Sequence, residues 1–155
     1  MAATTRPATA RPTAAPPAIA PPTAVVEALL GVHRVVVGGL GAALAAHGAS
    51  LDQWRVLRSL TETGCTMGEL TKALDIPPAS LTRIVDSLAS NALVYRRPDL
   101  SDRRLVVIHL SANGQQRLTR LDDAAGAYLG AVREQLGAEV FDRLGVVLDS
   151  ARRAI

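Results

Sequence analysis

Residues 66–110 read TMGELTKALDIPPASLTRIVDSLASNALVYRRPDLSDRRLVVIHL, and this stretch decides the fold. It contains, in order, a short helical segment, a proline-marked turn into a longer helix, and two strand-like runs joined by an arginine-rich turn. Thr66 and Glu69 have the spacing of a capping box, in which each side chain accepts a hydrogen bond from the other residue's backbone N–H. The pattern therefore predicts a short helix over 67–74.

A second helix is predicted to begin near Pro78. The prolines in 75–78 end the first helix, because proline donates no N–H and restricts the residue before it, yet proline is tolerated in a first helical turn. One buried stripe then recurs at i, i+3, i+4 and i+7, formed by Leu81, Ile84, Val85 and Leu88. The other faces carry small, hydrogen-bonding or charged residues, namely Ala79, Ser80, Thr82, Arg83, Asp86 and Ser87. Such a helix can lie against base edges in a DNA major groove.

The third signal is a β-hairpin, the wing, over 93–110. Residues 93–95 and 105–110 are rich in strand formers, and the segment 96–104 between them has turn residues at its centre and four arginines. A helix-turn-helix followed by a basic wing is the arrangement of a protein that reads double-stranded DNA. The predicted DNA contacts are Ala79, Ser80, Thr82, Arg83, Ser87, Arg96, Arg97, Asp102, Arg103 and Arg104.

The segments LTRIVDSL (81–88) and LVYRRPDLSDRRLVVIHLSANG (93–114) resemble the MarR family of bacterial transcriptional regulators. The resemblance runs from about residue 50 to residue 121 and is most specific in the wing, where Asp102 and Arg104 form an Asp-x-Arg before the last strand. We expect this pair to orient the wing, because a carboxylate near phosphate needs a neighbouring guanidinium. The resemblance implies a homodimer with intertwined terminal helices, and small aromatic or anionic effectors bound between those helices and the winged module.

Two positions depart from the family pattern. The residue before Leu93 is usually glycine and is here Ala92, so Asn91 is expected to supply the left-handed turn. The position before Pro78 is often a capping serine and is here Pro77, so the second helix is expected to lack a side-chain cap.

Apolar helices are predicted on both sides of the winged module. The helix over 24–46, which Thr23 can cap, is apolar around much of its circumference, and a surface helix needs only one such face. A second capping box at Ser50 and Gln53 begins a helix over 51–62. Two more helices are predicted over 112–136 and 138–154. A second copy of the chain is the expected cover for the surplus apolar surface.

The predicted fold class is mainly α with a small β-hairpin wing. A single domain, 23–155, is expected to contain the winged helix-turn-helix (50–110) and the N- and C-terminal dimerisation helices (23–47 and 111–155). Residues 1–22, rich in Ala, Pro and Thr, are expected to be a disordered tail, with Arg6 and Arg11 as an alternative minor-groove arm. No apolar run is expected to span a membrane, so a cytoplasmic protein is predicted.

The sequence offers no catalytic constellation, and we expect neither an enzyme nor a cofactor. The net charge of +3 is too small to indicate nucleic acid by itself. His33 and His47 are about 21 Å apart on the first helix at 1.5 Å per residue, so they cannot chelate a metal within one chain, whereas a zinc site shared between subunits stays open. The only cysteine, Cys65, precedes a helix N-terminus that can lower its pKa, so a redox role and a half-buried structural thiol both stay open.

Trp54 is expected in the core, with lining of an effector pocket as the alternative. His33 and Arg34 are the other candidates for such a pocket. The predicted function is a sequence-specific double-stranded DNA-binding transcriptional regulator, a homodimeric repressor relieved by a small ligand. The alternatives are a redox- or metal-responsive regulator of the same fold, and a protein-interaction winged helix that does not bind DNA.

Overall fold

The computed structural model describes residues 21–60, 63–99 and 102–154. Almost all of the predicted tail, including Arg6 and Arg11, lies outside the described residues. The chain divides by its contacts into two units, residues 1–33 and 34–155, so the division falls within the first helix. The single domain expected over 23–155 therefore stays a prediction.

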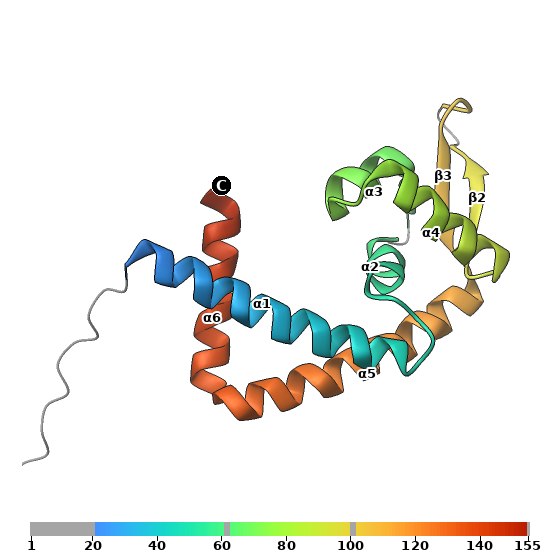
Figure 1. The fold of residues 1–155 in the computed structure, drawn as a ribbon. Coiled ribbons are helices and arrows are strands. Elements are labelled where there is room, and N and C mark those ends of the chain that lie inside the picture. The colour runs from blue at the N-terminus through green and yellow to red at the C-terminus, as the bar shows by residue number, and fades with distance from the viewer. Residues whose placement is uncertain (1–20, 61–62, 100–101, 155) are drawn as a thin grey trace, which may run out of the picture. The chain divides into compact units, whose positions relative to one another are not determined.

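The described residues are mainly helical, with a small antiparallel sheet (Figure 1). In chain order they form α1 (Pro22–Ala45), α2 (Leu51–Ser59), β1 (Cys65–Thr66), α3 (Met67–Leu74), α4 (Pro78–Ser90), β2 (Val94–Pro98), β3 (Val106–Leu110), α5 (Ala112–Leu136) and α6 (Ala138–Ala154). The bounds of α3, α5 and α6 are those predicted, those of α1 agree within two residues, and α4 begins at Pro78 as predicted. The helix predicted over 51–62 is shorter than expected, because α2 ends at Ser59 and Leu60 is its C-cap.

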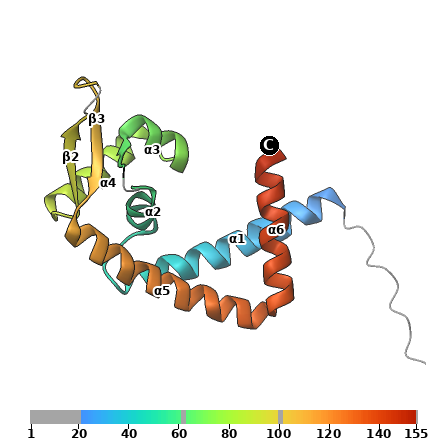
Figure 2. The same ribbon diagram turned by 180° about the vertical axis from the view of Figure 1, so that it is seen from behind.

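The winged module is organised around α2. Figures 1 and 2 show α2 between the α3–α4 pair and the N-terminal half of α5. The largest fully buried side chains of the described residues come from several elements: Leu44, Val56, Leu57, Leu70, Leu81, Val85, Ile108 and Leu121. Full burial of one such side chain contributes about 1.5–3 kcal/mol, so this shared core fixes α4 and the wing to α5.

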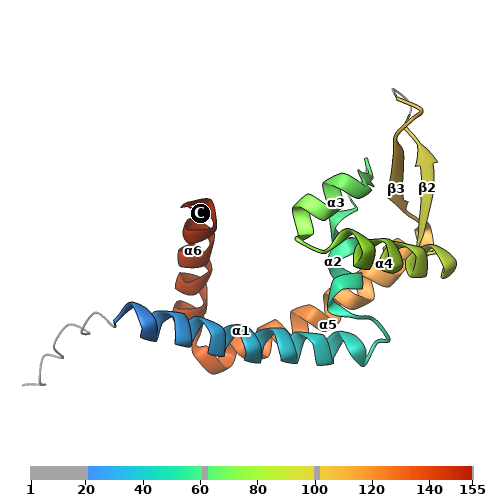
Figure 3. The same cartoon turned by 45° about the horizontal axis from the view of Figure 1, so that its top comes forward.

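The sheet has the strand order β1-β3-β2, with every pair antiparallel. The strand β1 was not predicted, because two residues are too few to show an alternating pattern. The strand β2 continues to Pro98, beyond the predicted end at Tyr95, because Arg96 and Arg97 pair across the ladder with β3. These two arginines are therefore strand residues and not turn residues. Figure 3 shows the β2–β3 hairpin projecting beside α4.

The helix caps agree with the sequence in α2, α3 and α4. Both predicted capping boxes form, at Ser50 with Gln53 and at Thr66 with Glu69. The backbone N–H and the hydroxyl of Thr66 donate to Glu69 and hold the pKa of that carboxyl below its usual value. The α4 helix begins after Pro77 without a side-chain cap, as predicted. The predicted cap of the first helix at Thr23 is wrong, because α1 already begins at Pro22.

The left-handed turn after α4 is made by Ala92 and not by Asn91. Ala92 has φ +54, whereas Asn91 has φ −91, so the expectation for Asn91 is wrong. The backbone N–H of Leu93 donates to the carbonyl of Leu88 at 2.9 Å, which closes the helix end around the left-handed residue. The hydroxyl of Ser111 also donates to the Ala92 carbonyl at 2.7 Å, so tertiary bonds offset the cost of a left-handed alanine.

By length and composition alone, the helix α1 could span a membrane. Its 24 residues include an 18-residue window with a mean hydropathy of 1.7, which meets the length and composition of a membrane span, so the expectation that no apolar run could span a membrane is wrong on length and composition. Core helices of soluble proteins pass the same test. Arg34 lies near the middle of α1, where a charged side chain would cost about 2.5–3.5 kcal/mol in a bilayer.

Gly39 allows α1 and α5 to approach closely. A Cβ atom at Gly39 would collide with the ring and hydroxyl of Tyr128, and that hydroxyl donates to the Val35 carbonyl at 3.3 Å. A Cβ atom at the neighbouring Gly38 would meet nothing within 4 Å. The two adjacent glycines therefore have different structural roles.

Gly39→Ala and Gly38→Ala should change stability in opposite directions. Gly39→Ala must displace Tyr128 and should lower the free energy of unfolding by about 1–2 kcal/mol, as overpacking does. Gly38→Ala should raise it by about 0.5–1 kcal/mol, because alanine favours a helix over glycine. Denaturant unfolding of both variants measures the two changes. Equal stabilisation by both would show that Tyr128 does not need the space at Gly39.

Candidate nucleic-acid interface

The helix α4 has one buried face and one exposed face. Leu81, Val85 and Leu88 are buried, while Ala79, Ser80, Thr82 and Arg83 are exposed. The hydroxyl of Thr82 donates to the Pro78 carbonyl at 2.9 Å, which leaves its lone pairs to accept a hydrogen bond from outside. Arg83 makes no ion pair within the described residues. The exposed face thus combines small residues with one available cation.

Two residues of the predicted DNA-contacting set, Arg96 and Ser87, make contacts within the protein. Arg96 on β2 donates to Asp86 of α4 at 2.5 Å, so this pair joins the wing to the helix. Ser87 is half-buried, and its carbonyl accepts from Ser90 and Asn91. Arg96 therefore orients the wing, and Ser87 lies at the edge of the exposed face.

Arg55 on α2 holds the turn that leads into α4. One end of its guanidinium donates to the Leu74 carbonyl at 2.6 Å, and the other donates to Asp52 at 3.1 Å. Asp75, the next residue, has φ +52, a left-handed conformation that ends α3. Sequence reasoning missed Arg55, and the i,i+3 spacing of Asp52 and Arg55 was the available signal.

The end of the wing is held by Asp102 and Arg104, as predicted. Asp102 accepts from the Arg104 guanidinium at 3.1 and 3.2 Å and from its backbone N–H at 3.0 Å. These bonds, the side-chain bond first, hold the pKa of the Asp102 carboxyl below its usual value. The two residues lie in a turn, in which the Leu105 N–H donates to the Asp102 carbonyl at 2.9 Å.

Arg97 and Arg103 are the wing arginines that make no ion pair within the described residues. Both side chains are exposed, Arg97 on β2 and Arg103 in the turn beyond it. With Arg83 they supply three uncommitted guanidinium groups from α4 and the wing. Arginine forms bidentate hydrogen bonds with phosphate and guanine, so this surface suits a nucleic-acid backbone and base edges.

The three residues predicted to bind an effector differ in burial. Trp54 is buried, its indole N–H donates to Asp122 at 2.8 Å, and the Arg58 guanidinium lies 5.0 Å from its ring centre. His33 and Arg34 are exposed on α1. The structure thus gives Trp54 a core position, and its grouping with the other two stays a prediction.

Cys65 is half-buried in β1, and its thiol donates to the Ser59 carbonyl at 3.1 Å. This position fits the structural thiol of the two alternatives. In the part of the chain that the structure describes, no group of three His, Cys, Asp or Glu residues is placed to hold a metal ion.

Residues 47–105 match the family model described as the MarR family. A curated relative, the uncharacterized HTH-type transcriptional regulator YhbI of Bacillus subtilis, is 30% identical over 93 residues, which are 59% of this chain and 55% of that protein. This chain thus spans about half the length of that relative. The name YhbI carries is that of a regulator and not of an enzyme, in agreement with the prediction.

Solved structures share the fold. Apo MarR from E. coli aligns with a TM-score of 0.72 at 24% identity, covering 86% of this chain and 98% of that chain. The transcriptional repressor CouR, solved with a 23-mer DNA duplex, aligns with a TM-score of 0.76 at 23% identity, covering 83% of this chain and 92% of that chain. CouR from Rhodococcus jostii RHA1 is also solved with p-coumaroyl-CoA, with a TM-score of 0.73. These likenesses confirm the predicted fold class.

Asp102→Ala should weaken DNA binding at neutral pH, although it removes a negative charge. The lowered pKa means that the Asp102–Arg104 pair is present above the ordinary carboxyl range and is lost as pH falls through the folded-state pKa. Without the pair, the turn that presents Arg103 loses its anchor. Fluorescence anisotropy with one duplex measures the change. Asp123→Ala, which removes an exposed acid of α5, is the matched control. Tighter binding by Asp102→Ala would make Asp102 only a repulsive bystander.

Proposed function

We propose that the protein, whose residues 47–105 match the model of the MarR family, is a sequence-specific double-stranded DNA-binding transcriptional regulator that acts as a homodimer. The supporting observation is the two-sided helix α4. Its apolar stripe is fixed in the core, so the face with Ser80, Thr82 and Arg83 is available to base edges. The DNA-bound structure of CouR, a protein of the same fold, supports this reading.

The start of α4 adds support for phosphate contact. The Pro77 side chain makes no cap bond, and the first turn of α4 contains no acidic residue. Backbone N–H groups in a first helical turn lack intrahelical partners and attract anions. A phosphate can therefore be held at the same end of α4 that presents Ala79 and Ser80. Such a contact would set the register of the helix in the groove.

The exposed apolar residues support the homodimer. On α6, Val140, Val146 and Val147 are 56%, 68% and 62% exposed, and Leu148 is 45% exposed. On α1, Val25, Val26, Leu29 and Leu30 are each more than half exposed. Monomers rarely expose apolar surface of this extent. A two-fold dimer would set two copies of α4 into successive major grooves, about 34–36 Å apart.

Repression relieved by a small ligand is the regulatory part of the proposal. CouR is named a transcriptional repressor and is solved with p-coumaroyl-CoA, which supports this mode for a protein of the same fold. We place the protein in the cytoplasm, where its DNA target would be. A redox- or metal-responsive regulator and a winged helix that binds only protein are the competing functions.

Salt-dependent duplex binding tests the proposal. Sheared genomic DNA captured by the purified protein is sequenced, and one recovered duplex is titrated across a range of salt concentrations. Arginine–phosphate contacts release counterions, so log K should fall steeply with log salt. Absence of duplex binding at low salt would favour the protein-interaction winged helix. Release of the duplex by peroxide or zinc, and not by organic acids, would favour the redox or metal regulator.

Arg83 and Arg103 should affect binding in different ways. Arg83→Ala should cost about 1–3 kcal/mol on the selected duplex and relax one base position, because Arg83 lies on the face that reads bases. Arg103→Ala should weaken all duplexes alike and lower the salt slope by about one contact. Anisotropy titrations with selected and random duplexes measure both. Equal losses on the two duplexes for Arg83→Ala would show that Arg83 touches only phosphate.

Val147→Glu should shift the protein from dimer to monomer. Val147 is one of the exposed apolar residues of α6. A glutamate carboxylate at this position cannot be buried against a partner subunit without a large desolvation cost. Gly145→Glu introduces the same charge two residues away, where an added Cβ atom would meet nothing within 4 Å. Sedimentation velocity on both variants gives the association state. A stable Val147→Glu dimer would remove α6 from the proposed interface.

A further inference from the structure

Asp86 is the only acidic residue of α4, and it lies at the centre of the exposed face. Ala79, Arg83, Asp86 and Ser90 are spaced at i, i+4, i+7 and i+11, so they form one line along the helix, and all four are exposed. Phosphate repels a carboxylate, so a role for Asp86 at a DNA surface must involve a hydrogen-bond donor. The base edges are the part of DNA that supplies donors.

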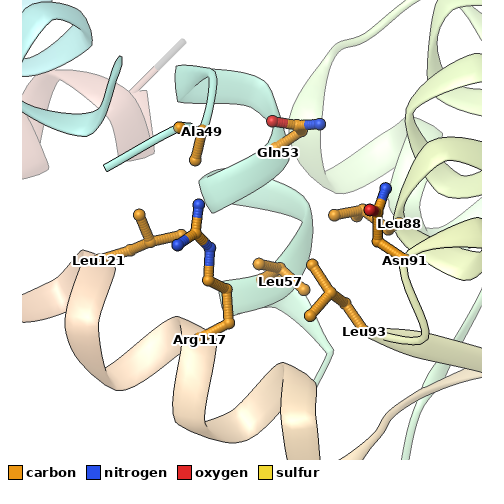
Figure 4. Close-up of a pocket in the computed structure, with 9 residues that line it drawn as sticks. Ala49, Gln53, Leu57, Leu88, Asn91, Leu93, Arg117 and Leu121 are labelled. Atoms are coloured by element: carbon orange, nitrogen blue, oxygen red, sulfur yellow. The ribbon is translucent and has the colours of Figure 1, made fainter. Parts of the chain in front are cut away.

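Packing on the opposite side of α4 fixes the direction of Asp86. Leu88 follows Asp86 by two residues, which is about 200° around a helix of 3.6 residues per turn. Figure 4 shows Leu88 extending from α4 toward α2, the helix that carries Leu57, and both leucines are almost fully buried. The Asp86 side chain is more than half exposed. It therefore points away from the core, on the same side of α4 as Arg83.

One oxygen of the Asp86 carboxylate is held by the wing. The Arg96 guanidinium of β2 donates to Oδ1 at 2.5 Å, and this ion pair offsets the negative charge that phosphate would repel. The other oxygen, Oδ2, has no hydrogen-bond partner in the described part of the chain. An ionised carboxylate only accepts hydrogen bonds, and each oxygen has about two lone-pair sites. Oδ2 can therefore accept a hydrogen bond from outside the protein.

The separation of Arg83 and Asp86 is close to that of neighbouring base pairs. Three residues of α-helix rise about 4.5 Å, and successive base pairs of B-DNA lie about 3.4 Å apart. Arg83 offers only donors and Asp86 only acceptors.

The pattern of donors and acceptors in the major groove selects the base that suits Asp86. Cytosine presents the N4 amino group, which is a donor, whereas guanine and thymine present acceptors that repel a carboxylate. The N6 amino group of adenine is also a donor, but it lies beside the acceptor N7. Cytosine is therefore the base from which Asp86 accepts best, and guanine, with two acceptors, suits Arg83.

We propose that Asp86 is a specificity-determining residue, whose Oδ2 accepts a hydrogen bond from the N4 amino group of a cytosine next to the base pair that Arg83 contacts. This assignment rests on the proposed DNA-binding function. Arg96 is a positioning residue, because it holds Oδ1 and offsets the carboxylate charge. In a two-fold dimer the same cytosine occurs in each half-site.

Replacement of single cytosines in the selected duplex tests this contact. Each cytosine of one half-site is changed in turn to thymine, with adenine opposite, or to N4-methylcytosine. The methylated base keeps its Watson–Crick pair and loses the N–H that points into the major groove. Fluorescence anisotropy at constant salt gives the dissociation constants. At one cytosine, both changes should weaken wild-type binding by about tenfold, the loss expected for one base contact.

Asp86→Asn should remove this discrimination. At the same cytosine, N4-methylation should change the affinity of Asp86→Asn by less than about twofold, because the carboxylate that accepts from N4 is gone. The variant should also bind the duplex with adenine at this position more tightly than the duplex with cytosine, since asparagine pairs with N6 and N7 of adenine. A residue that only supports the fold would not change the preferred base.

Two control variants separate base reading from the ion pair. Arg96→Ala removes the ion pair and leaves the carboxylate, so it should weaken every duplex and retain the loss at the same cytosine. Asp123→Asn changes an exposed acid of α5 and should behave as the wild type does.

The outcomes distinguish this assignment from the proposed function. No loss at any cytosine in the wild type, or equal losses in the wild type and Asp86→Asn, would overturn the assignment of Asp86 and leave the DNA-binding function standing. Loss of the discrimination in Arg96→Ala as complete as in Asp86→Asn would also overturn it, because Asp86 would then act only by holding the wing. Absence of duplex binding by the wild type at low salt would refute the proposed function itself.

Discussion

The burial of one apolar stripe of α4 against α2 and α3 determines which face of α4 is left exposed. Leu81 and Val85 are fully buried and Leu88 nearly so. Each contributes about 1.5–3 kcal/mol, whereas an exposed ion pair such as Arg96–Asp86 contributes about 0–1 kcal/mol. A rotation of α4 would expose this stripe, and no surface contact could offset that loss. The exposed face of α4 is therefore set by hydrophobic packing, and the arginines only use the surface that the core leaves open.

Local sequence signals predicted the helices and their ends well. The capping boxes at Ser50 and Thr66 and the uncapped start after Pro77 depend on residues three or four positions apart, so the sequence contains all that is needed. The Asp102–Arg104 pair was predicted for the same reason, because the two residues are only two positions apart. Features made by distant residues were missed. The strand β1 exists only because Cys65 and Thr66 pair with β3, and the left-handed Ala92 is held by Ser111, 19 residues later.

In the candidate site too, features made by residues close in sequence were predicted and features made by distant residues were missed. Exposure of Ser80, Thr82 and Arg83 followed from the 3.6-residue period, which places them opposite the leucine stripe. Arg55, which anchors the turn before α4, reaches the Leu74 carbonyl 19 residues away, and no periodic pattern indicates such a bond. Among the wing arginines, Arg96 and Arg104 form ion pairs with Asp86 and Asp102, whereas the other two form none within the described residues, and this difference could be seen only in the structure.

The position of Trp54 gives the protein an internal optical reporter. Trp54 is the only tryptophan in the chain, and its indole joins α2 to α5 through Asp122 while the Arg58 guanidinium lies over the ring. The emission of a tryptophan depends on the polarity and hydrogen bonding around its indole. Intrinsic fluorescence of the unlabelled protein therefore reports on the junction between the winged module and the long helix α5. Any movement that separates these two elements has a spectral signature without an added dye.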